Sequence, residues 1–426
     1  MGDTLWTGAS LLTLLLLAMV VLLGLVIWSI RRHRNPKLDF ECGLPIDQLV
    51  PSLAGLSLGV ALPGNSVEVF ENGSFFDALL QEIDAAQHSI HFESFLWKDG
   101  VLGRRLADAF CRRASEGVQV RILLDANGAK EIGEAVEAQL KASACQLAFF
   151  HRARLRYIGV LNNRDHRKLA VFDGRTAFAG GHCVVDSWLG DAQDKDHFAD
   201  VSVRVRGPIV GHLQGVFSEN WAGQTGELFI GGDVFPALSA AGDILMHVAF
   251  SKPEGSAPAV KILHHAVICF AQKRLWIQNP YFIPEPEAIV AFAQAVRRGV
   301  DVRVMMPSTG GSDFPMVQHA GHFQFERLLR AGVRLFEYPH TLLHQKVIVV
   351  DSVWSSVGSC NFDDRSFEIN DEVTLGMLDA GIARRLEAIF EKYAPECREI
   401  ELEAWRRRGL KHRIIDRLAY SINEVL

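Results

Sequence analysis

A motif of histidine, lysine, aspartate and two small residues occurs twice in this sequence of 426 residues, with the same spacings each time. The first copy contains His166, Lys168, Asp173, Gly180 and Gly181. The second copy contains His344, Lys346, Asp351, Gly358 and Ser359. A single H-x-K is common and means little, but two copies with the carboxylate and the small residues in register indicate a duplicated unit. We therefore expect the chain to fold as two similar halves.

The stretch before each motif predicts the same order of elements, namely helix, strand, helix, strand. In the first half these segments cover residues 75–86, 89–97, 102–114 and 117–125. In the second half they cover residues 260–271, 274–282, 288–298 and 299–307. Two generic αβ units would also look alike, but the shared motif argues against that explanation. We expect an α/β fold with a mostly parallel sheet, in two units that cover residues 63–240 and 241–404.

Each motif can bind an anion. Residues i and i+2 share one face of a strand, so an imidazole and an ammonium group lie side by side in each copy. A pseudo-twofold axis would bring both pairs around one phosphoryl group, where one imidazole attacks phosphorus and the other protonates the leaving oxygen. The lysines and the backbone N–H groups of the small-residue turns would stabilise the developing charge. No carboxylate cluster indicates a metal, and we expect no cofactor.

Both motifs resemble the paired H-x-K-x4-D motifs of the phospholipase D superfamily; they read HRKLAVFDGRTAFAGG and HQKVIVVDSVWSSVGSCN. From about residue 63 onward the chain resembles the bacterial cardiolipin synthase branch, in segments that include PGNSVEVFENG, PYFIPE, LLRAGVRLFEY and NFDDRSFEINDE. The resemblance implies two fused phospholipase D-like αβ units, a phosphohistidine intermediate and no metal. It also implies transfer of a phosphatidyl group between phosphatidylglycerol molecules, which gives cardiolipin and glycerol.

The resemblance also implies roles for the motif residues. His166 and His344 match the catalytic pair, with His166 as the nucleophile, and Lys168 and Lys346 match the phosphate-binding lysines. The motif aspartates follow a buried strand and open a turn. We expect them to brace that turn and tune charge rather than to touch the substrate.

Three further residues match positions outside the paired motifs. Asn361 matches a phosphate-contacting asparagine, and Asp200 and Glu372 fall where the family has carboxylates that orient the histidines. Such a carboxylate fixes the tautomer that leaves the other ring nitrogen free to attack, whereas the alternative is an ordinary solvated strand residue. The sequence departs from the family at Cys183, where the first copy usually has asparagine. The neighbouring His182 is either a substitute for that contact or a turn residue.

The N-terminal segment predicts a membrane anchor. Residues 4–30 are uncharged and long enough to cross roughly 30 Å of hydrocarbon, whereas a cleaved signal peptide would carry Lys or Arg before a shorter apolar run. Three arginines within residues 31–34 follow it, so the positive-inside rule places the catalytic part in the cytoplasm, behind a single pass through the inner membrane. Seven scattered cysteines agree with a reducing compartment.

Two more segments flank the catalytic units. Residues 31–62 include Pro36, Pro45 and Pro51 in a mixed sequence and predict a linker whose short apolar stretches pack on the part of the chain that follows. Residues 405–426 place apolar side chains at helical spacing among arginines and lysines, which predicts a basic amphipathic helix. Such a helix either lies on an anionic membrane or docks on the catalytic domain with a solvated basic edge.

A membrane-anchored phosphatidyltransferase is the leading interpretation, with phosphatidylglycerol and the membrane as partners. A phospholipase D that gives the phosphohistidine to water is the same-fold alternative. A nucleic-acid phosphodiesterase fits poorly with a formal net charge of −6 and with the anchor, so we expect no nucleic acid as partner. An inactive membrane scaffold fits poorly with two intact His-Lys pairs. The sequence indicates no particular oligomeric state.

Overall fold

The protein forms two compact units, within Met1–Asp39 and Phe40–Leu426. The structure, a computed structural model, describes residues 13–24, 40, 43–151, 163–252 and 258–423. In the first unit residues 13–24 are helical, while both ends of the expected transmembrane segment 4–30 lie outside the described residues. Among the helices that are described, none combines the length and the apolar character that a membrane crossing requires.

The first half of the second unit contains strands β1 to β7. They are β1 (Leu62–Glu71), β2 (Ser89–Ser94), β3 (Gln119–Asp125), β4 (Gln146–Phe150), β5 (Leu169–Phe172), β6 (Thr176–Gly180) and β7 (Val201–Arg206). Its helices are α3 (Ser74–Ala85), α4 (Val101–Ser115), α5 (Glu134–Ala142) and α6 (Ile209–Thr225). Helix α2 (Ile46–Leu56) precedes them, inside the segment expected to be a linker.

The second half repeats this series and adds a C-terminal extension. Its strands are β8 (Ile244–Ser251), β9 (Arg274–Gln278), β10 (Asp301–Pro307), β11 (Arg334–Tyr338), β12 (Val347–Val350), β13 (Trp354–Gly358), β14 (Glu372–Leu378) and β15 (Arg398–Glu399). Its helices are α7 (Ala259–Phe270), α8 (Pro286–Arg297), α9 (Pro315–Ala331), α10 (Asp364–Glu368), α11 (Ala380–Tyr393), α12 (Leu402–Arg406) and α13 (Leu410–Tyr420).

All of these strands belong to one sheet whose two halves have the same strand order. Outward from the central β1–β8 pair, the first half runs β1-β7-β6-β5-β2-β3-β4. The second half runs β8-β14-β13-β12-β9-β10-β11, with β15 at the edge. The duplicated αβ organisation expected from the motifs is therefore confirmed.

The expectation of a mostly parallel sheet is wrong. Parallel pairing is confined to β2–β3–β4 and β9–β10–β11, where helices connect the strands. The motif strands instead pair as hairpins, β5 with β6 and β12 with β13. A tight turn can join only antiparallel strands, so each motif brings an antiparallel block into the sheet.

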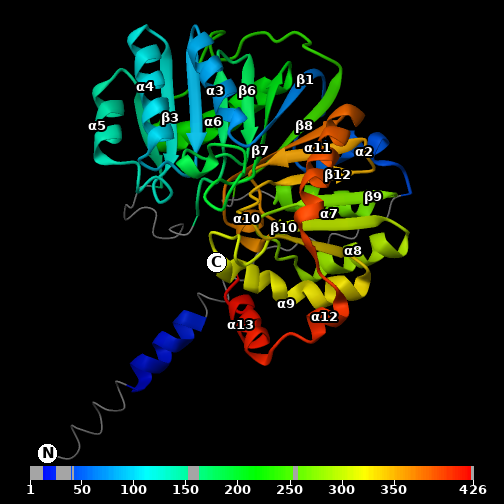
Figure 1. Ribbon diagram of the computed structural model, residues 1–426. Helices are drawn as coiled ribbons and strands as arrows, with labels where there is room; N and C mark the ends of the chain where they lie inside the picture. Colours follow the sequence, from blue (N-terminus) through cyan, green and yellow to red (C-terminus); the bar gives the residue numbers. More distant parts are fainter. Residues whose placement is uncertain (1–12, 25–39, 41–42, 152–162, 253–257, 424–426) are drawn as a thin grey trace, which may run out of the picture. The chain divides into compact units, whose positions relative to one another are not determined.

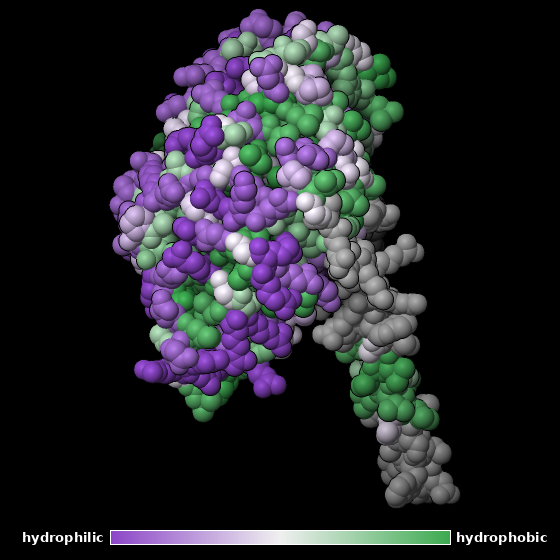
Figure 2. Space-filling view, turned by 90° about the vertical axis from the view of Figure 1, so that its right-hand side faces the viewer, coloured by the Kyte–Doolittle hydropathy of each residue, from purple (hydrophilic) through white to green (hydrophobic). Residues whose placement is uncertain are grey.

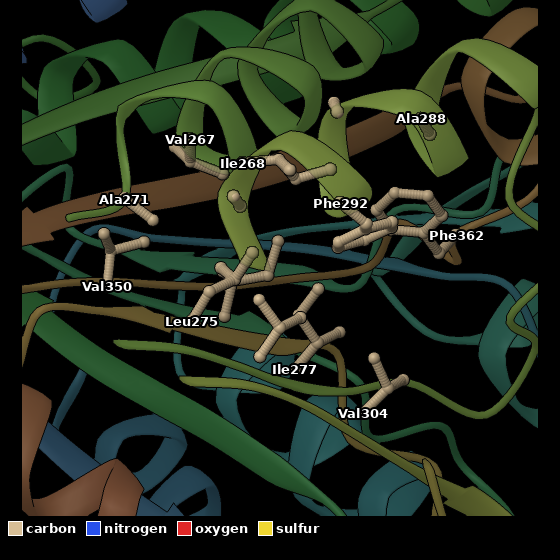
Figure 3. Packing of buried hydrophobic residues seen from close by; sticks show 14 of the residues in the cluster. Val267, Ile268, Ala271, Leu275, Ile277, Ala288, Phe292, Val304, Val350 and Phe362 are labelled. Atoms are coloured by element: carbon tan, nitrogen blue, oxygen red, sulfur yellow. The ribbon is translucent and has the colours of Figure 1, made fainter. Parts of the chain in front are cut away.

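Three large hydrophobic clusters hold the unit together. One lies in each half between its helices and the sheet; in the second half Ile268 and Phe292 pack over Leu275 and Ile277 (Figure 3). The third cluster contains residues of both halves, including side chains from α6 and α11. Because the halves share this core, the ends of their motif strands are fixed relative to each other.

Helix α13 docks on the second half and lies beside α9 (Figure 1). Its Asp416 and Ala419 are buried, while Leu410, Ile414 and Leu418 are 73%, 51% and 62% exposed. The C-terminal helix therefore packs on the catalytic unit and still presents an apolar stripe to the outside.

Candidate active site

The backbone of the opposite half holds each motif histidine in place. His166 precedes β5, and its N–H donates to the carbonyl of Asp371 at 3.0 Å. His344 precedes β12, and its N–H donates to the carbonyl of Ala199 at 2.7 Å. Isolated bridges at 165–371 and 199–343 extend both contacts. The two motifs therefore lie next to each other, at the place where the backbone of each half contacts the motif of the other.

The same contact pairs each imidazole with a carboxylate of the other half. His166 Nδ1 lies 2.9 and 3.1 Å from the two carboxylate oxygens of Glu372. His344 Nδ1 lies 2.7 Å from Asp200 Oδ2. Burial opposes ionisation of Glu372, but the neighbouring His166 and Lys168 hold the pKa of that carboxyl below its usual value. A carboxylate that accepts from Nδ1–H leaves Nε2 without a proton and able to act as a nucleophile or a base.

Both motif lysines are buried beside the histidines. Lys168 Nζ donates to the carbonyl of His166 at 2.6 Å, and Lys346 Nζ donates to the carbonyl of His344 at 2.7 Å. Burial lowers the pKa of His166 to about 4, with Lys168 and Lys346 adding to the effect. Burial and the same two ammonium groups hold the pKa of His344 well below its usual value. The four side chains therefore share one site, in which both imidazoles are neutral at neutral pH.

Small residues let the carboxylate strands approach the motifs closely. A Cβ on Gly181 would lie 2.1 Å from Asp200 Oδ1, and one on Gly180 would lie 2.1 Å from Ser202 Oγ. A Cβ on Gly358 would lie 2.4 Å from the carbonyl oxygen of Val373. The second copy differs at Ser359, whose hydroxyl donates to the carboxylate that pairs with His166. The two small residues of each motif are thus part of the histidine-carboxylate geometry.

The motif aspartates lie at the opposite ends of the motif strands and do not join the histidines. Asp173 accepts hydrogen bonds from the backbone N–H groups of residues 87–89 at 2.7–2.9 Å. Asp351 accepts from residues 272–274 at 2.7–3.1 Å. These bonds fix the turn after each motif strand to the start of β2 or β9, which is a bracing contact.

Asn361 and Cys183 occupy equivalent positions, 178 residues apart like the motif histidines. The side-chain oxygen of Asn361 is buried and makes no hydrogen bond within the described part of the chain. This oxygen can only accept, so a contact with a phosphoryl oxygen would have to come from the amide nitrogen of the same side chain. Burial raises the pKa of the Cys183 thiol, which is therefore neutral.

His182 does not substitute for the missing asparagine. One ring nitrogen lies 2.7 Å from the hydroxyl of Ser202, and the other lies 2.9 Å from the carbonyl oxygen of Asn72. The ring also stacks on Phe75, with 4.5 Å between ring centroids. Both nitrogens already have partners, so this histidine is a packed residue of the first half.

Two aromatic residues of the site were not predicted from the sequence. The Trp188 indole N–H donates to Asp200 Oδ2 at 2.7 Å, and its ring meets His344 edge-on at 5.1 Å. Phe95 meets His166 edge-on at 5.0 Å. Among eight tryptophans and 26 phenylalanines, no spacing distinguishes these two, because their role depends on the crossing of the halves.

Two αβ halves that each supply a His-Lys pair to one site define the phospholipase D class of fold. The crystal structure of phosphatidylserine synthase from Haemophilus influenzae Rd KW20 has this fold. It matches 88% of this chain and 100% of that chain, with a TM-score of 0.63 and 15% sequence identity.

The sequence comparisons narrow the class to one family. The family model described as cardiolipin synthase, PLD-like domain, matches residues 79–221 and 265–394. Cardiolipin synthase 2 of Bacillus anthracis is 31% identical over 91% of this chain and 74% of its own length. Cardiolipin synthase A of Pseudomonas putida is 35% identical over 86% of this chain and 76% of its own length. The chain belongs to the cardiolipin synthase family and is a phosphatidyltransferase of the phospholipase D type.

Proposed function

We propose that this enzyme transfers a phosphatidyl group from one phosphatidylglycerol to a headgroup hydroxyl of a second one, through a phosphohistidine intermediate. The observation that carries the proposal is the crossed pairing of His166 with Glu372 and of His344 with Asp200. It leaves two imidazole Nε2 atoms available beside two ammonium groups, which is what attack on phosphorus and protonation of the leaving oxygen require.

In the first step Nε2 of His166 attacks the phosphorus of phosphatidylglycerol and the bond to the headgroup glycerol breaks. His344, carrying a proton on Nε2, gives it to the departing glycerol oxygen. Burial keeps both imidazoles neutral in the free enzyme, so this proton enters with the substrate. The anionic phosphodiester next to His344 raises the pKa of that imidazole and makes the uptake favourable.

In the second step a hydroxyl of another phosphatidylglycerol attacks the phosphohistidine. His344, now neutral, takes the proton of that hydroxyl, and the bond from phosphorus to His166 breaks. The products are cardiolipin and a regenerated imidazole. Throughout both steps Lys168, Lys346 and the amide of Asn361 hold the phosphoryl oxygens, where charge accumulates.

We propose that the reaction takes place at the cytoplasmic face of the inner membrane. The uncharged run at residues 4–30 and the arginines after it support a single pass with this orientation. The exposed stripe of α13 supports a second contact, because exposed Lys411, Arg413 and Arg417 accompany its apolar side chains. Figure 2 shows hydrophobic surface bordered by hydrophilic residues at the lower end of the large unit, where Figure 1 places α13. A site held at the bilayer meets the second lipid at high effective concentration.

The test is to trap the intermediate on phosphate-labelled phosphatidylglycerol by rapid quenching under alkaline conditions, where phosphohistidine persists. We expect label on the peptide that contains His166, and a loss of turnover of at least about 10⁴-fold in both His166→Ala and His344→Ala. The exposed His340→Ala is the matched control and should behave like the wild type. Label on His344 would reverse the assigned roles, and substantial turnover in either well-folded variant would refute the shared site.

A further inference from the structure

Three histidines and one aspartate gather between α9 and α13, on helices that carry none of the motif residues. His319 and His322 stand three residues apart on α9, and His412 and Asp416 stand four residues apart on α13. Their candidate ligand atoms all lie within 4.8 Å of one another. We propose that this cluster binds one divalent transition-metal ion, with zinc as the best fit, and that the ion clasps α13 onto α9.

The spacing of the four side chains suits a tetrahedral ion. Asp416 Oδ1 lies 2.8 Å from His319 Nδ1, 3.7 Å from His322 Nδ1 and 3.9 Å from His412 Nε2. Around tetrahedral zinc, with bonds of about 2.0–2.1 Å, neighbouring ligand atoms are roughly 3.3 Å apart. The three distances bracket that value, so small side-chain rotations complete the geometry. Imidazole and carboxylate ligands favour zinc over magnesium or calcium, which prefer oxygen ligands alone.

The surroundings of His322 point to a ligand as well. Its Nε2 lies 3.0 Å from Glu337 Oε1, a contact that orients the ring and directs Nδ1 toward Asp416. Nδ1 is buried, faces Asp416 and makes no hydrogen bond to any residue that the structure describes. At 3.7 Å from Asp416 Oδ1 this buried nitrogen is beyond hydrogen-bond distance, and a metal ion between the two atoms would give both of them a ligand bond.

The hydrogen bonds around the cluster are of the kind that orient metal ligands. Metal-binding histidines commonly donate their other N–H to a carboxylate, as His322 does to Glu337. The second oxygen of Asp416 accepts from Arg408 Nε at 3.2 Å, which orients the carboxylate. His412 is half exposed, with 43% of its side-chain surface accessible, and offers the ion a path in from solvent.

The clasp has a mechanical consequence for α13. Apart from Asp416, the buried residue of this helix is Ala419, which packs with Ile283, Val317 and Ala320 in a small apolar cluster. Tyr420 of the same helix also stacks on Phe323 of α9, with 4.4 Å between ring centroids. An ion shared between α9 and α13 would fix the position of the helix and of its exposed stripe. This inference does not depend on the proposed chemistry at the motif histidines.

The test uses the full-length protein, stripped with a chelator, supplied with zinc chloride in slight excess and desalted. We expect about one zinc ion per chain by elemental mass spectrometry in the wild type and in the exposed-site control His88→Ala. His412→Ala and Asp416→Asn should bind none. Zinc, but not magnesium, should raise the Tm of the wild type by roughly 2–5 °C and leave that of His412→Ala unchanged. Zinc should also protect the wild type from trypsin at Lys411 and Arg413.

Because His412 is half exposed, its replacement tests the site even if the buried Asp416→Asn fails to fold. Wild-type protein that retains no zinc after desalting would overturn the inference. The four side chains would then form only a network of hydrogen bonds and ion pairs. Equal zinc in the wild type and His412→Ala would also overturn it, because the ion would then sit elsewhere. None of these measurements depends on transferase activity. A failure of this inference can therefore be distinguished from a failure of the proposed function.

Discussion

Lys346 is the residue whose ionisation sets the pH range in which the free site can bind an anion. Burial lowers its pKa to about 7; Lys168 adds to the effect and Asp200 opposes it. An amine is cationic below its pKa, so the charge that holds the phosphate is lost as the pH rises through about 7. Because His344 must also take up a proton with the substrate, we predict that kcat/KM already falls as the pH rises toward this value, and that above it the fall becomes steeper by about a further tenfold per pH unit.

The bound phosphodiester raises the pKa of the same amine, so kcat should stay constant to a higher pH than kcat/KM. Steady-state rates on phosphatidylglycerol in mixed micelles between pH 5 and 9 measure both. Replacement of the exposed Lys141 by alanine serves as the control and should leave both profiles unchanged. A pH dependence of kcat/KM that does not become steeper between pH 7 and 9 would show that the Lys346 charge is not needed for binding.

Gly181 is needed for space rather than for flexibility. A methyl group there would lie 2.1 Å from Asp200 Oδ1, so the carboxylate that pairs with His344 must move. We predict that Gly181→Ala lowers the free energy of unfolding by about 1–3 kcal/mol and the transfer rate by roughly 100-fold. Gly215→Ala on α6 is the control, because a methyl group there would meet nothing within 4 Å. We expect this variant to be more stable by about 0.5–1 kcal/mol, because alanine favours a helix over glycine. Urea unfolding and initial rates measure both; equal behaviour of the two variants would contradict the steric argument.

Among single residues, the paired motifs indicated the histidines and lysines, and the family resemblance indicated Asp200 and Glu372 as orienting carboxylates without assigning each to one histidine. Regular spacing reveals residues that occupy equivalent places in both halves, such as Cys183 and Asn361. It does not reveal which carboxylate pairs with which histidine. That choice depends on how the halves contact each other. Asp200 and Glu372 occupy equivalent places at the start of β7 and β14, but Asp200 follows His166 by 34 residues whereas Glu372 follows His344 by 28, so regular spacing does not reveal their equivalence.

At the level of elements, the hydrophobic periodicity predicted the helices and strands of each half but not the direction of strand pairing. The segment 75–86 corresponds to α3 and the segment 260–271 to α7, each within one residue. The direction in which two strands pair depends on the connection between them. Each motif forms a hairpin with a tight turn, so its two strands are antiparallel, which the expectation of a parallel sheet did not take into account. The expected linker also contains a helix, α2, which packs into the core of the second half.

Helix α13 should bind anionic bilayers in its own right. Residues 1–39 form a separate unit, so a chain without residues 1–34 keeps the catalytic unit whole. We predict that this chain still sediments with vesicles that contain phosphatidylglycerol, and that serine at Leu410, Ile414 and Leu418 abolishes binding. Serine at Leu228 and Ile230, which are 75% and 85% exposed on another segment, is the control. Unchanged sedimentation of the α13 variant would refute this membrane contact.

At the scale of the whole molecule, the duplication explains why the chain builds one site rather than two. Each half carries a histidine whose orienting carboxylate and backbone partner belong to the other half. Neither half is complete alone, and the shared hydrophobic core fixes their relation. The site therefore forms only when the two halves are folded together.

The central claim is that this site passes a phosphatidyl group to a lipid hydroxyl in preference to water. The most direct measurement supplies the full-length enzyme with phosphatidylglycerol vesicles and quantifies cardiolipin, glycerol and phosphatidic acid by mass spectrometry. We predict cardiolipin and glycerol in equal amounts, with phosphatidic acid as a minor product because water competes for the phosphohistidine. Phosphatidic acid as the main product, with little cardiolipin, would contradict the account and identify the enzyme as a hydrolase.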